Sequence, residues 1–224
     1  MITDKIVLYS HGFGVKKDDR GLFSDIASSL DNFQHVMFDY NQTNEHDNTL
    51  TVIPLHEQAK MLKSQYDSLR SNFPGAIIDL VCHSQGCVAA GLAGLEGVRK
   101  TILLAPPTYF LDSEASIEQM LGRDGTVIEN GVINYPRRDG STTIIRQDFW
   151  QSIDRISDPI TLFNKLSQVT DVTIIEALSD EVLGESDYSD LSDDILHIQQ
   201  EANHDFTDGS RPVLSKTIAE ILGE

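Results

Sequence analysis

The chain has 224 residues and a net charge of −18, from 35 acidic against 17 basic side chains. This length suits one domain whose core needs no disulfides, and the 40% hydrophobic content argues against disorder. An acidic surface repels phosphate groups, so we expect neither nucleic acid nor a membrane as a partner. No apolar stretch is long enough for a signal peptide or a membrane span, which favours a cytoplasmic protein.

Six short segments rich in Val, Ile and Leu have the continuous apolar character of strands covered on both faces. In chain order they are residues 5–10, 34–40, 76–82, 99–105, 171–177 and 194–200. Apolar residues at helical spacing lie between several of them, at 22–30 and 59–69, and again after residue 212. This alternation predicts an α/β fold built on a doubly wound, mainly parallel six-stranded sheet.

A long insertion separates the fourth predicted strand from the fifth. It begins at Pro106-Pro107 and contains short helical patterns at 117–121, 149–153 and 160–166. Its strand-like segments at 126–135 and 142–147 flank Arg137-Arg138-Asp139-Gly140, which is a hairpin signal. Open α/β sheets bind ligands beyond the carboxyl ends of their strands. We therefore expect residues 107–168 to form a cap over a core of residues 1–106 and 169–224.

The third strand runs into Cys82-His83-Ser84-Gln85-Gly86, and a helix of small residues follows. A strand that passes through a serine into a helix is the pattern of a nucleophile elbow, whose tight turn requires small neighbours. Gly86 meets this requirement, and Cys82 is small enough to meet it. We interpret Ser84 as a nucleophile, against the plainer reading of a serine that caps a helix. Cys82 and Cys87 are interpreted as reduced packing residues.

A serine nucleophile needs a base, and the base needs an orienting acid. Asp180 follows the fifth strand and His204 follows the sixth, in the chain order serine, acid, histidine that this architecture uses. We therefore predict that Ser84, Asp180 and His204 form a catalytic triad. Three other acids are possible in place of Asp180, namely Asp171, Glu181 and Asp205.

The loop His11-Gly12-Phe13-Gly14 follows the first strand. A tetrahedral oxyanion needs hydrogen-bond donors held in place around it. The backbone N–H of Gln85, directly after the nucleophile, is one candidate, and the N–H of Phe13 is the second. The alternative for this loop is an ordinary glycine turn.

Residues of the cap are candidates for contact with a substrate. Tyr109, Phe110 and Trp150, with Phe149, could line an apolar pocket or form plain core. Arg137 and Arg138 could meet an anionic group or lie on a solvated hairpin tip. We expect no metal and no cofactor, because Asn44-Glu45-His46-Asp47 lacks the spacing of a metal site and is interpreted as a polar surface loop.

Four motifs together resemble the α/β-hydrolase superfamily. They are His11-Gly12-Phe13-Gly14, Cys82-His83-Ser84-Gln85-Gly86, Ser179-Asp180-Glu181-Val182 and Asn203-His204-Asp205-Phe206. The resemblance covers nearly the whole chain, although the antiparallel strands usual at the N-terminus of the superfamily are missing. The first motif, the small size and the hairpin-bearing insertion are similar to compact bacterial carboxylesterases of the cinnamoyl or feruloyl type. This resemblance implies a roofed acyl pocket, with Ser84 as nucleophile, His204 as base and Asp180 as orienting acid.

The leading hypothesis is a cofactor-free serine esterase that cleaves esters of small acyl or aryl groups through an acyl-enzyme on Ser84. Thioester, lactone or peptide hydrolysis with the same triad stays open, because residues in the cap decide the leaving group. A ligand-binding protein that has this fold without catalysis stays open as well. The oligomeric state does not follow from the sequence.

Overall fold

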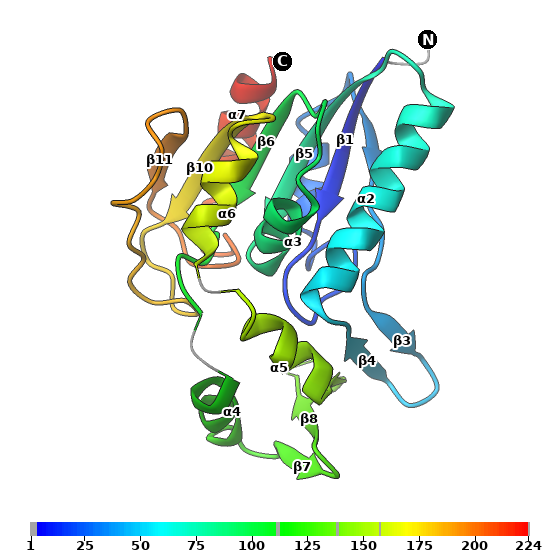
Figure 1. The fold of residues 1–224 in the computed structure, drawn as a ribbon, viewed down its shortest axis with the longest axis vertical. Helices are drawn as coiled ribbons and strands as arrows, with labels where there is room; N and C mark the ends of the chain where they lie inside the picture. The colour runs from blue at the N-terminus through cyan, green and yellow to red at the C-terminus, as the bar shows by residue number, and fades with distance from the viewer. Residues whose placement is uncertain (1–3, 111–112, 138, 157, 224) are drawn as a thin grey trace.

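The main sheet is parallel throughout. The computed structural model describes residues 4–110, 113–137, 139–156 and 158–223 (Figure 1). The strand order is β11-β10-β6-β5-β1-β2, and all five neighbouring pairs are parallel. The six strands predicted from the sequence are confirmed as β1 (Lys5–Ser10), β2 (Gln34–Val36), β5 (Ile77–His83), β6 (Lys100–Leu104), β10 (Asp171–Ala177) and β11 (Leu196–Gln200).

The two edge strands are shorter than the sequence pattern predicted. β2 ends at Val36 rather than at residue 40, because residues beyond it bond to the loop after β1 instead of to the sheet. The N–H of Tyr40 donates to His11 Nε2 at 3.1 Å, and Asp39 accepts the N–H of Lys17 at 2.6 Å. β11 begins at Leu196 rather than at residue 194, after a turn in which Ile195 N–H donates to the Ser192 carbonyl.

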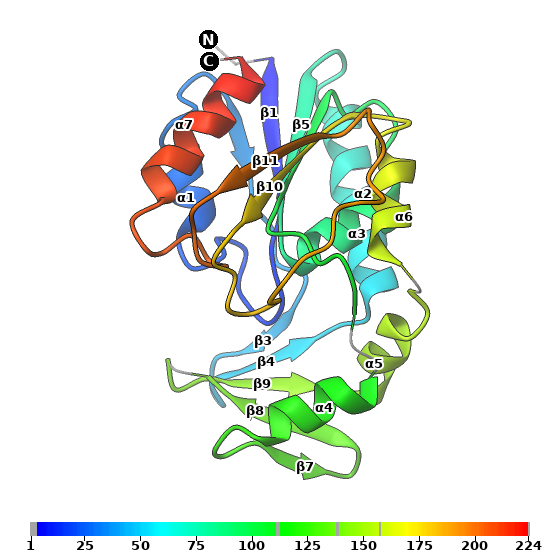
Figure 2. The same ribbon diagram turned by 90° about the vertical axis from the view of Figure 1, so that its left-hand side faces the viewer.

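Helices cover both faces of this sheet (Figure 2). One face carries α2 (Leu55–Asn72), α3 (Gln85–Ala93) and α6 (Pro159–Leu166), and the other carries α1 (Leu22–Ala27) and α7 (Arg211–Leu222). Side chains of β1 alternate between the two apolar clusters, with Leu8 in the first and Val7 in the second. Burial on both faces explains why the strands read as continuous apolar runs.

A second sheet lies beyond the carboxyl ends of the main strands (Figure 1). Its order is β3-β4-β9-β8-β7, with bounds β3 (Gln42–Asn44), β4 (Thr49–Val52), β7 (Val127–Glu129), β8 (Val132–Pro136) and β9 (Thr142–Ile145). The predicted hairpin joins β8 to β9, where Pro136 pairs with Thr142. Segment 126–135 is itself a hairpin rather than one strand, because Asn130 and Gly131 turn the chain with φ of 51° and 77°.

Two distant parts of the chain build this second sheet. The hairpin of β3 and β4, which the sequence pattern did not predict, pairs through β4 with β9 in parallel register. Helices α4 (Ser113–Leu121) and α5 (Gln147–Ile153) lie beside it (Figures 1 and 2). Val52, Ile145 and Phe149 are buried in the same apolar cluster as β1, so the second sheet and the main sheet share one continuous interior.

Within the described residues, no helix combines the length and the apolar character needed to cross a membrane. Both cysteines, Cys82 and Cys87, are buried free thiols, as the sequence indicated.

We expect Asp79→Ala to lower the free energy of unfolding by roughly 2 kcal/mol, measured by urea denaturation. Asp79 is fully buried in β5 and accepts from Arg99 Nε at 2.9 Å and from the N–H of Lys100 at 3.1 Å, so its loss leaves both donors without this acceptor. Asp67→Ala is the control, because its pair with Lys63 is exposed and should be worth less than about 1 kcal/mol. Equal losses in the two variants would contradict the prediction.

Candidate functional site

Ser84 sits in a strained turn between β5 and α3. Its φ of 51° and ψ of −123° lie in a region that residues with a side chain rarely adopt. The turn stays attached to the sheet, because the Ser84 N–H donates to the Leu104 carbonyl of β6 at 2.9 Å. A Cβ added to Gly86 would lie 2.2 Å from the Ser10 carbonyl oxygen, so no side chain fits there. The elbow predicted from the sequence is therefore present, with Cys82 buried just before it.

The structure brings the three predicted triad residues together. His204 Nε2 lies 3.0 Å from Ser84 Oγ, and His204 Nδ1 lies 2.7 Å from Asp180 Oδ2. Asp180 follows the end of β10 and His204 follows the end of β11, so both loops meet the elbow at the same edge of the sheet. With a proton on Nδ1 directed at the carboxylate, Nε2 is free to accept the serine hydroxyl proton.

The alternative acids have other partners or positions. Glu181 Oε2 accepts the backbone N–H of His204 at 3.2 Å, and Asp205 forms an ion pair with Arg20. Asp171 lies at the first position of β10, at the opposite end of that strand. Among the four candidate acids, Asp180 alone bonds the His204 ring through an interaction that the structure describes.

The surroundings of Asp180 keep its carboxylate charged. Burial alone would raise the pKa of Asp180, but hydrogen bonding to His204 and the charge of that ring lower it, as do two backbone N–H groups. These are the N–H groups of Val182 and Leu183, which donate to Oδ1 at 2.9 and 2.7 Å. The net shift of the pKa is downward, so Asp180 accepts hydrogen bonds on both oxygens at neutral pH.

The two predicted oxyanion donors lie beside the serine. Gln85 is the first residue of α3, directly after Ser84, and a Cβ added to Gly12, next to Phe13, would lie 3.4 Å from Ser84 Cβ. Within the described residues, no protein acceptor bonds the backbone N–H of Phe13 or of Gln85. The His11 ring is held between the Gly12 carbonyl at 3.0 Å and the Tyr40 N–H at 3.1 Å.

Sequence reasoning missed a second histidine–carboxylate pair at this edge. His83 Nδ1 lies 2.8 Å from Asp19 Oδ2, and both side chains are 2% exposed. The motif that contains Ser84 includes His83, but no pattern in the sequence linked it to Asp19, which lies 64 residues earlier.

The predicted substrate residues divide into two groups. Tyr109 and Phe110 line a cavity of about 190 Å³ whose other walls are Pro107, Thr108, Ser116, Gln119, Val182, Leu183 and Ser186. Trp150 is instead buried in the apolar core beside Phe149 and is not part of that lining. Arg137 donates to the Gly14 carbonyl at 3.0 Å, whereas Arg138 lies outside the described residues.

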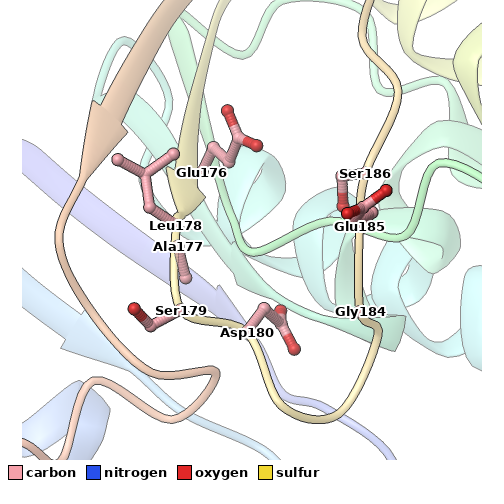
Figure 3. A pocket seen from close by; sticks show the side chains of 8 residues that line it. All are labelled: Glu176, Ala177, Leu178, Ser179, Asp180, Gly184, Glu185 and Ser186. Atoms are coloured by element: carbon pink, nitrogen blue, oxygen red, sulfur yellow. The ribbon is translucent and has the colours of Figure 1, made fainter.

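A second hollow of about 410 Å³ lies along the loop that follows β10 (Figure 3). Figure 3 shows the chain passing from Ala177 through Asp180 and back past Gly184. The carboxylates of Glu176 and Glu185 lie on opposite sides of the hollow. Its acidic lining makes it an unsuitable place for an anion.

One group of described residues has the composition of a metal site. His83, His204 and Asp205 offer ligand atoms within 4.8 Å of one another. The ring nitrogens of both histidines, however, already face partners in the protein, which are Asp19, the His204 carbonyl, Asp180 and Ser84. The geometry therefore favours hydrogen bonding over metal binding.

Comparison with known proteins identifies the fold. The sequence matches no known family model and no curated protein. The structure is similar to the α/β hydrolase GrgF from Penicillium sp. sh18, with a TM-score of 0.70, 15% identity, and coverage of 97% of this chain and 88% of that one. It is also similar to the Pyrococcus furiosus esterase Pf2001, with a TM-score of 0.69, 12% identity, and coverage of 98% and 81%.

A third similar structure is Est1E from Butyrivibrio proteoclasticus with bound ferulic acid. Its TM-score is 0.65 at 15% identity, with coverage of 97% of this chain and 88% of that one. The chain therefore has the α/β-hydrolase fold, as its motifs predicted.

We expect Gly86→Ala to lower the free energy of unfolding by about 3 kcal/mol, because the added methyl group would overlap the Ser10 carbonyl. Chemical denaturation followed by circular dichroism measures this loss. Gly122→Ala is the matched control, since its new methyl group would lie 3.4 Å from the nearest atom and should change stability by less than about 0.5 kcal/mol. If Gly86→Ala leaves the free energy of unfolding unchanged, α3 can move away from β1 without a loss of stability, which would contradict the prediction.

Proposed function

We propose that this protein is a serine esterase that hydrolyses carboxylic esters of small acyl or aryl groups. The observation that supports it most strongly is the hydrogen-bonded chain from Ser84 Oγ through His204 to Asp180, with distances of 3.0 and 2.7 Å. Geometry of this kind activates a serine hydroxyl. The esterases among the similar structures favour the same conclusion, although their identity to this chain is low.

In the proposed acylation step, Ser84 Oγ attacks the ester carbonyl carbon while His204 Nε2 takes the hydroxyl proton. The oxyanion that forms receives hydrogen bonds from the N–H groups of Phe13 and Gln85. The C–O bond to the leaving group then breaks, and His204 returns the proton to the departing alcohol. Asp180 stays ionised and stabilises the imidazolium during this step.

In the proposed deacylation step, a water molecule gives its proton to His204 Nε2 and attacks the acyl-enzyme. Collapse of the second tetrahedral intermediate releases the carboxylic acid, and the proton returns to Ser84 Oγ. The protein ends in its starting state, so the cycle needs no cofactor.

The cavity lined by Tyr109 and Phe110 supports a small aryl group, and its lining residues do not include Ser84 or His204. It lies between α4 of the cap and the loop after β10, beside Val182 and Leu183, whose N–H groups hold Asp180. A cavity of about 190 Å³ is below the usual range for drug-sized ligands. Thioester, lactone or peptide substrates, and binding without turnover, remain competing hypotheses, and the cytoplasmic location remains a prediction.

We expect Ser84→Ala to abolish hydrolysis of 4-nitrophenyl esters and labelling by a fluorophosphonate probe, while the circular dichroism spectrum stays unchanged. The alanine retains the fold but removes the only atom that becomes acylated. A panel of matched ester, thioester and amide substrates, tested on the wild type, separates the competing leaving groups. Ester turnover that persists in Ser84→Ala would rule out this serine as the nucleophile.

We expect Asp180→Asn to lower kcat by about 10⁴-fold, because the amide no longer stabilises the imidazolium and favours the wrong tautomer of His204. Steady-state kinetics with a 4-nitrophenyl ester measure this loss. Asp205→Asn is the comparison, since Asp205 bonds Arg20 rather than the His204 ring, and its effect on kcat should be far smaller. If Asp180→Asn leaves kcat nearly unchanged, another acid has the orienting role.

A further inference from the structure

Both ring nitrogens of His83 face hydrogen-bond acceptors. Nδ1 lies 2.8 Å from Asp19 Oδ2, and Nε2 lies 3.0 Å from the backbone carbonyl oxygen of His204. A neutral imidazole carries one N–H, so one of these contacts would place two lone pairs against each other. The imidazolium donates to both acceptors and leaves neither unsatisfied. With Asp19 ionised, the geometry therefore favours a positively charged His83.

His11, another buried histidine at this edge, shows the contrast. Its Nδ1 faces the Gly12 carbonyl at 3.0 Å, but its Nε2 receives the N–H of Tyr40 at 3.1 Å. One acceptor and one donor around the ring match a neutral imidazole. Burial lowers the pKa of His11, in agreement with that state.

Asp19 connects His83 to the loop after β1. Its Oδ2 also accepts the N–H of Gly12 at 2.8 Å, one residue before the proposed oxyanion donor Phe13. Asp19 and the next residue, Arg20, both have positive φ, 45° and 56°, which strains residues that carry side chains. The backbone thus adopts an unfavourable conformation that brings one carboxylate to both partners.

Electrostatics favour the charged pair. Burial alone would lower the pKa of His83, but the charge and hydrogen bond of Asp19, with the bond to the His204 carbonyl, raise it overall. Burial alone would raise the pKa of Asp19, yet the charge of His83 and the two hydrogen bonds lower it to about 2. The other titratable groups facing His83 are the His204 ring, 5.0 Å away between centroids, His11 and Asp205.

We propose that the His83–Asp19 ion pair is a positioning device for the reaction proposed above, on which it rests. His83 holds the His204 carbonyl so that this ring reaches Ser84 and Asp180 together. Asp19 holds Gly12 so that the next N–H points at the oxyanion. Neither side chain touches the substrate, so both act through other residues.

The protonation state of His83 can be tested without turnover. In wild-type protein labelled with ¹⁵N-histidine, NMR at pH 7 should show protons on both ring nitrogens of His83, assigned by comparison with His83→Gln. Because the negative charge of Asp19 favours the imidazolium, Asp19→Asn should move the His83 titration to lower pH. A neutral His83 in the wild type at pH 7 would overturn the proposal, whether or not the protein is an esterase.

The positioning role can be tested by kinetics. Asp19→Asn and His83→Gln should each lower kcat for a 4-nitrophenyl ester by about 100-fold, as misplaced catalytic groups do, with KM nearly unchanged. In the wild type, kcat should fall at high pH as His83 loses its proton, and in Asp19→Asn this fall should begin at lower pH. Asp79→Asn, which weakens a buried ion pair elsewhere in the sheet, should lower stability and leave kcat unchanged.

Unchanged kcat in both variants would overturn the positioning role. Failure of the proposed function is a separate result, because it would appear as wild-type protein that neither hydrolyses esters nor reacts with a fluorophosphonate. If Asp19→Asn does not fold, the kcat of His83→Gln and the pH dependence of kcat in the wild type still test the positioning role.

A different observation concerns three arginines beside the same loop. Arg137 Nη2 donates to the Gly14 carbonyl at 3.0 Å, and the guanidinium carbons of Arg123 and Arg137 lie 4.9 and 5.9 Å from the centroid of the Tyr135 ring. Arg20 lies near enough to lower the pKa of Arg137, after the larger effect of burial. Within the described residues, neither Arg123 nor Arg137 forms an ion pair with a carboxylate, although acids outnumber bases 35 to 17.

Asp205 balances Arg20, and Asp139 partly offsets the charge of Arg137. A bound anion would offset the repulsion that remains among the three arginines. Arg137 contacts Gly14, two residues beyond the loop position that touches Ser84, so its guanidinium lies on the order of 10 Å from the serine. We propose that Arg137 and Arg123 bind a carboxylate at the far end of the acyl group. This inference also rests on the proposed function, and it makes half-esters of dicarboxylic acids the preferred substrates.

The test compares 4-nitrophenyl hydrogen glutarate with 4-nitrophenyl pentanoate, which has the same chain length and no charge. The wild type should favour the anionic ester in kcat/KM by about tenfold at low salt, and added NaCl should reduce this ratio. Arg137→Gln and Arg123→Gln should bring the ratio toward one. Arg155→Gln, an exposed arginine of the cap, should keep it.

Equal kcat/KM for the two esters in the wild type, or a preference that both substitutions leave intact, would overturn the carboxylate subsite. Calorimetric binding of the anionic ester to Ser84→Ala tests the subsite without chemistry. Tighter binding of the anionic ester by that variant would support the subsite even if the esterase proposal failed, and binding no tighter than that of the neutral ester would count against it.

Discussion

The close contact between α3 and β1 is the constraint on which the site depends. Gly86 packs directly against the Ser10 carbonyl, and Ser10 Oγ donates to the Gly86 carbonyl at 2.8 Å. Because no Cβ separates the helix from the strand, the chain can turn sharply enough to hold Ser84 with φ of 51°. The turn lifts the serine hydroxyl toward the loops at the carboxyl edge of the sheet, where His204 reaches it. Parallel strand order then brings the loops after β1, β10 and β11 to that edge.

Hydrogen-bond partners favour a particular protonation state for each of the three buried histidines at this edge. His11 has one donor and one acceptor around its ring, which suits a neutral imidazole, whereas His83 has two acceptors, which favour the imidazolium. His204 has the Asp180 carboxylate on Nδ1 and the Ser84 hydroxyl on Nε2, the arrangement of a general base. In a low-dielectric interior an unmatched polar contact is costly, so these partners constrain the protonation states strongly.

The second sheet and α5 contact the loop after β1 directly. Arg137 of the cap bonds the Gly14 carbonyl in the loop after β1, and Phe13 of that loop packs on Phe149 of α5, with ring centroids 5.4 Å apart. The parallel pairing of β4 with β9 joins residues 142–145 to residues 49–52. Through these contacts, a change in the cap can reach the proposed oxyanion donors.

Local pattern was enough to predict the six parallel strands, the serine turn, and the acid and histidine on the loops after β10 and β11. A strand buried on both faces needs a continuous run of apolar residues, and a tight turn needs small residues. Both features can therefore be recognised from residues adjacent in the sequence. Contacts between segments that are far apart in the chain cannot be recognised in this way. Pairing of β3 and β4 with the cap, the burial of Trp150, and the bonds from Asp19 to Gly12 and His83 arise only when the folded chain brings separate segments together. The sequence by itself therefore determined the sheet and the candidate nucleophile, while the tertiary structure decided which polar groups meet and what charge they carry.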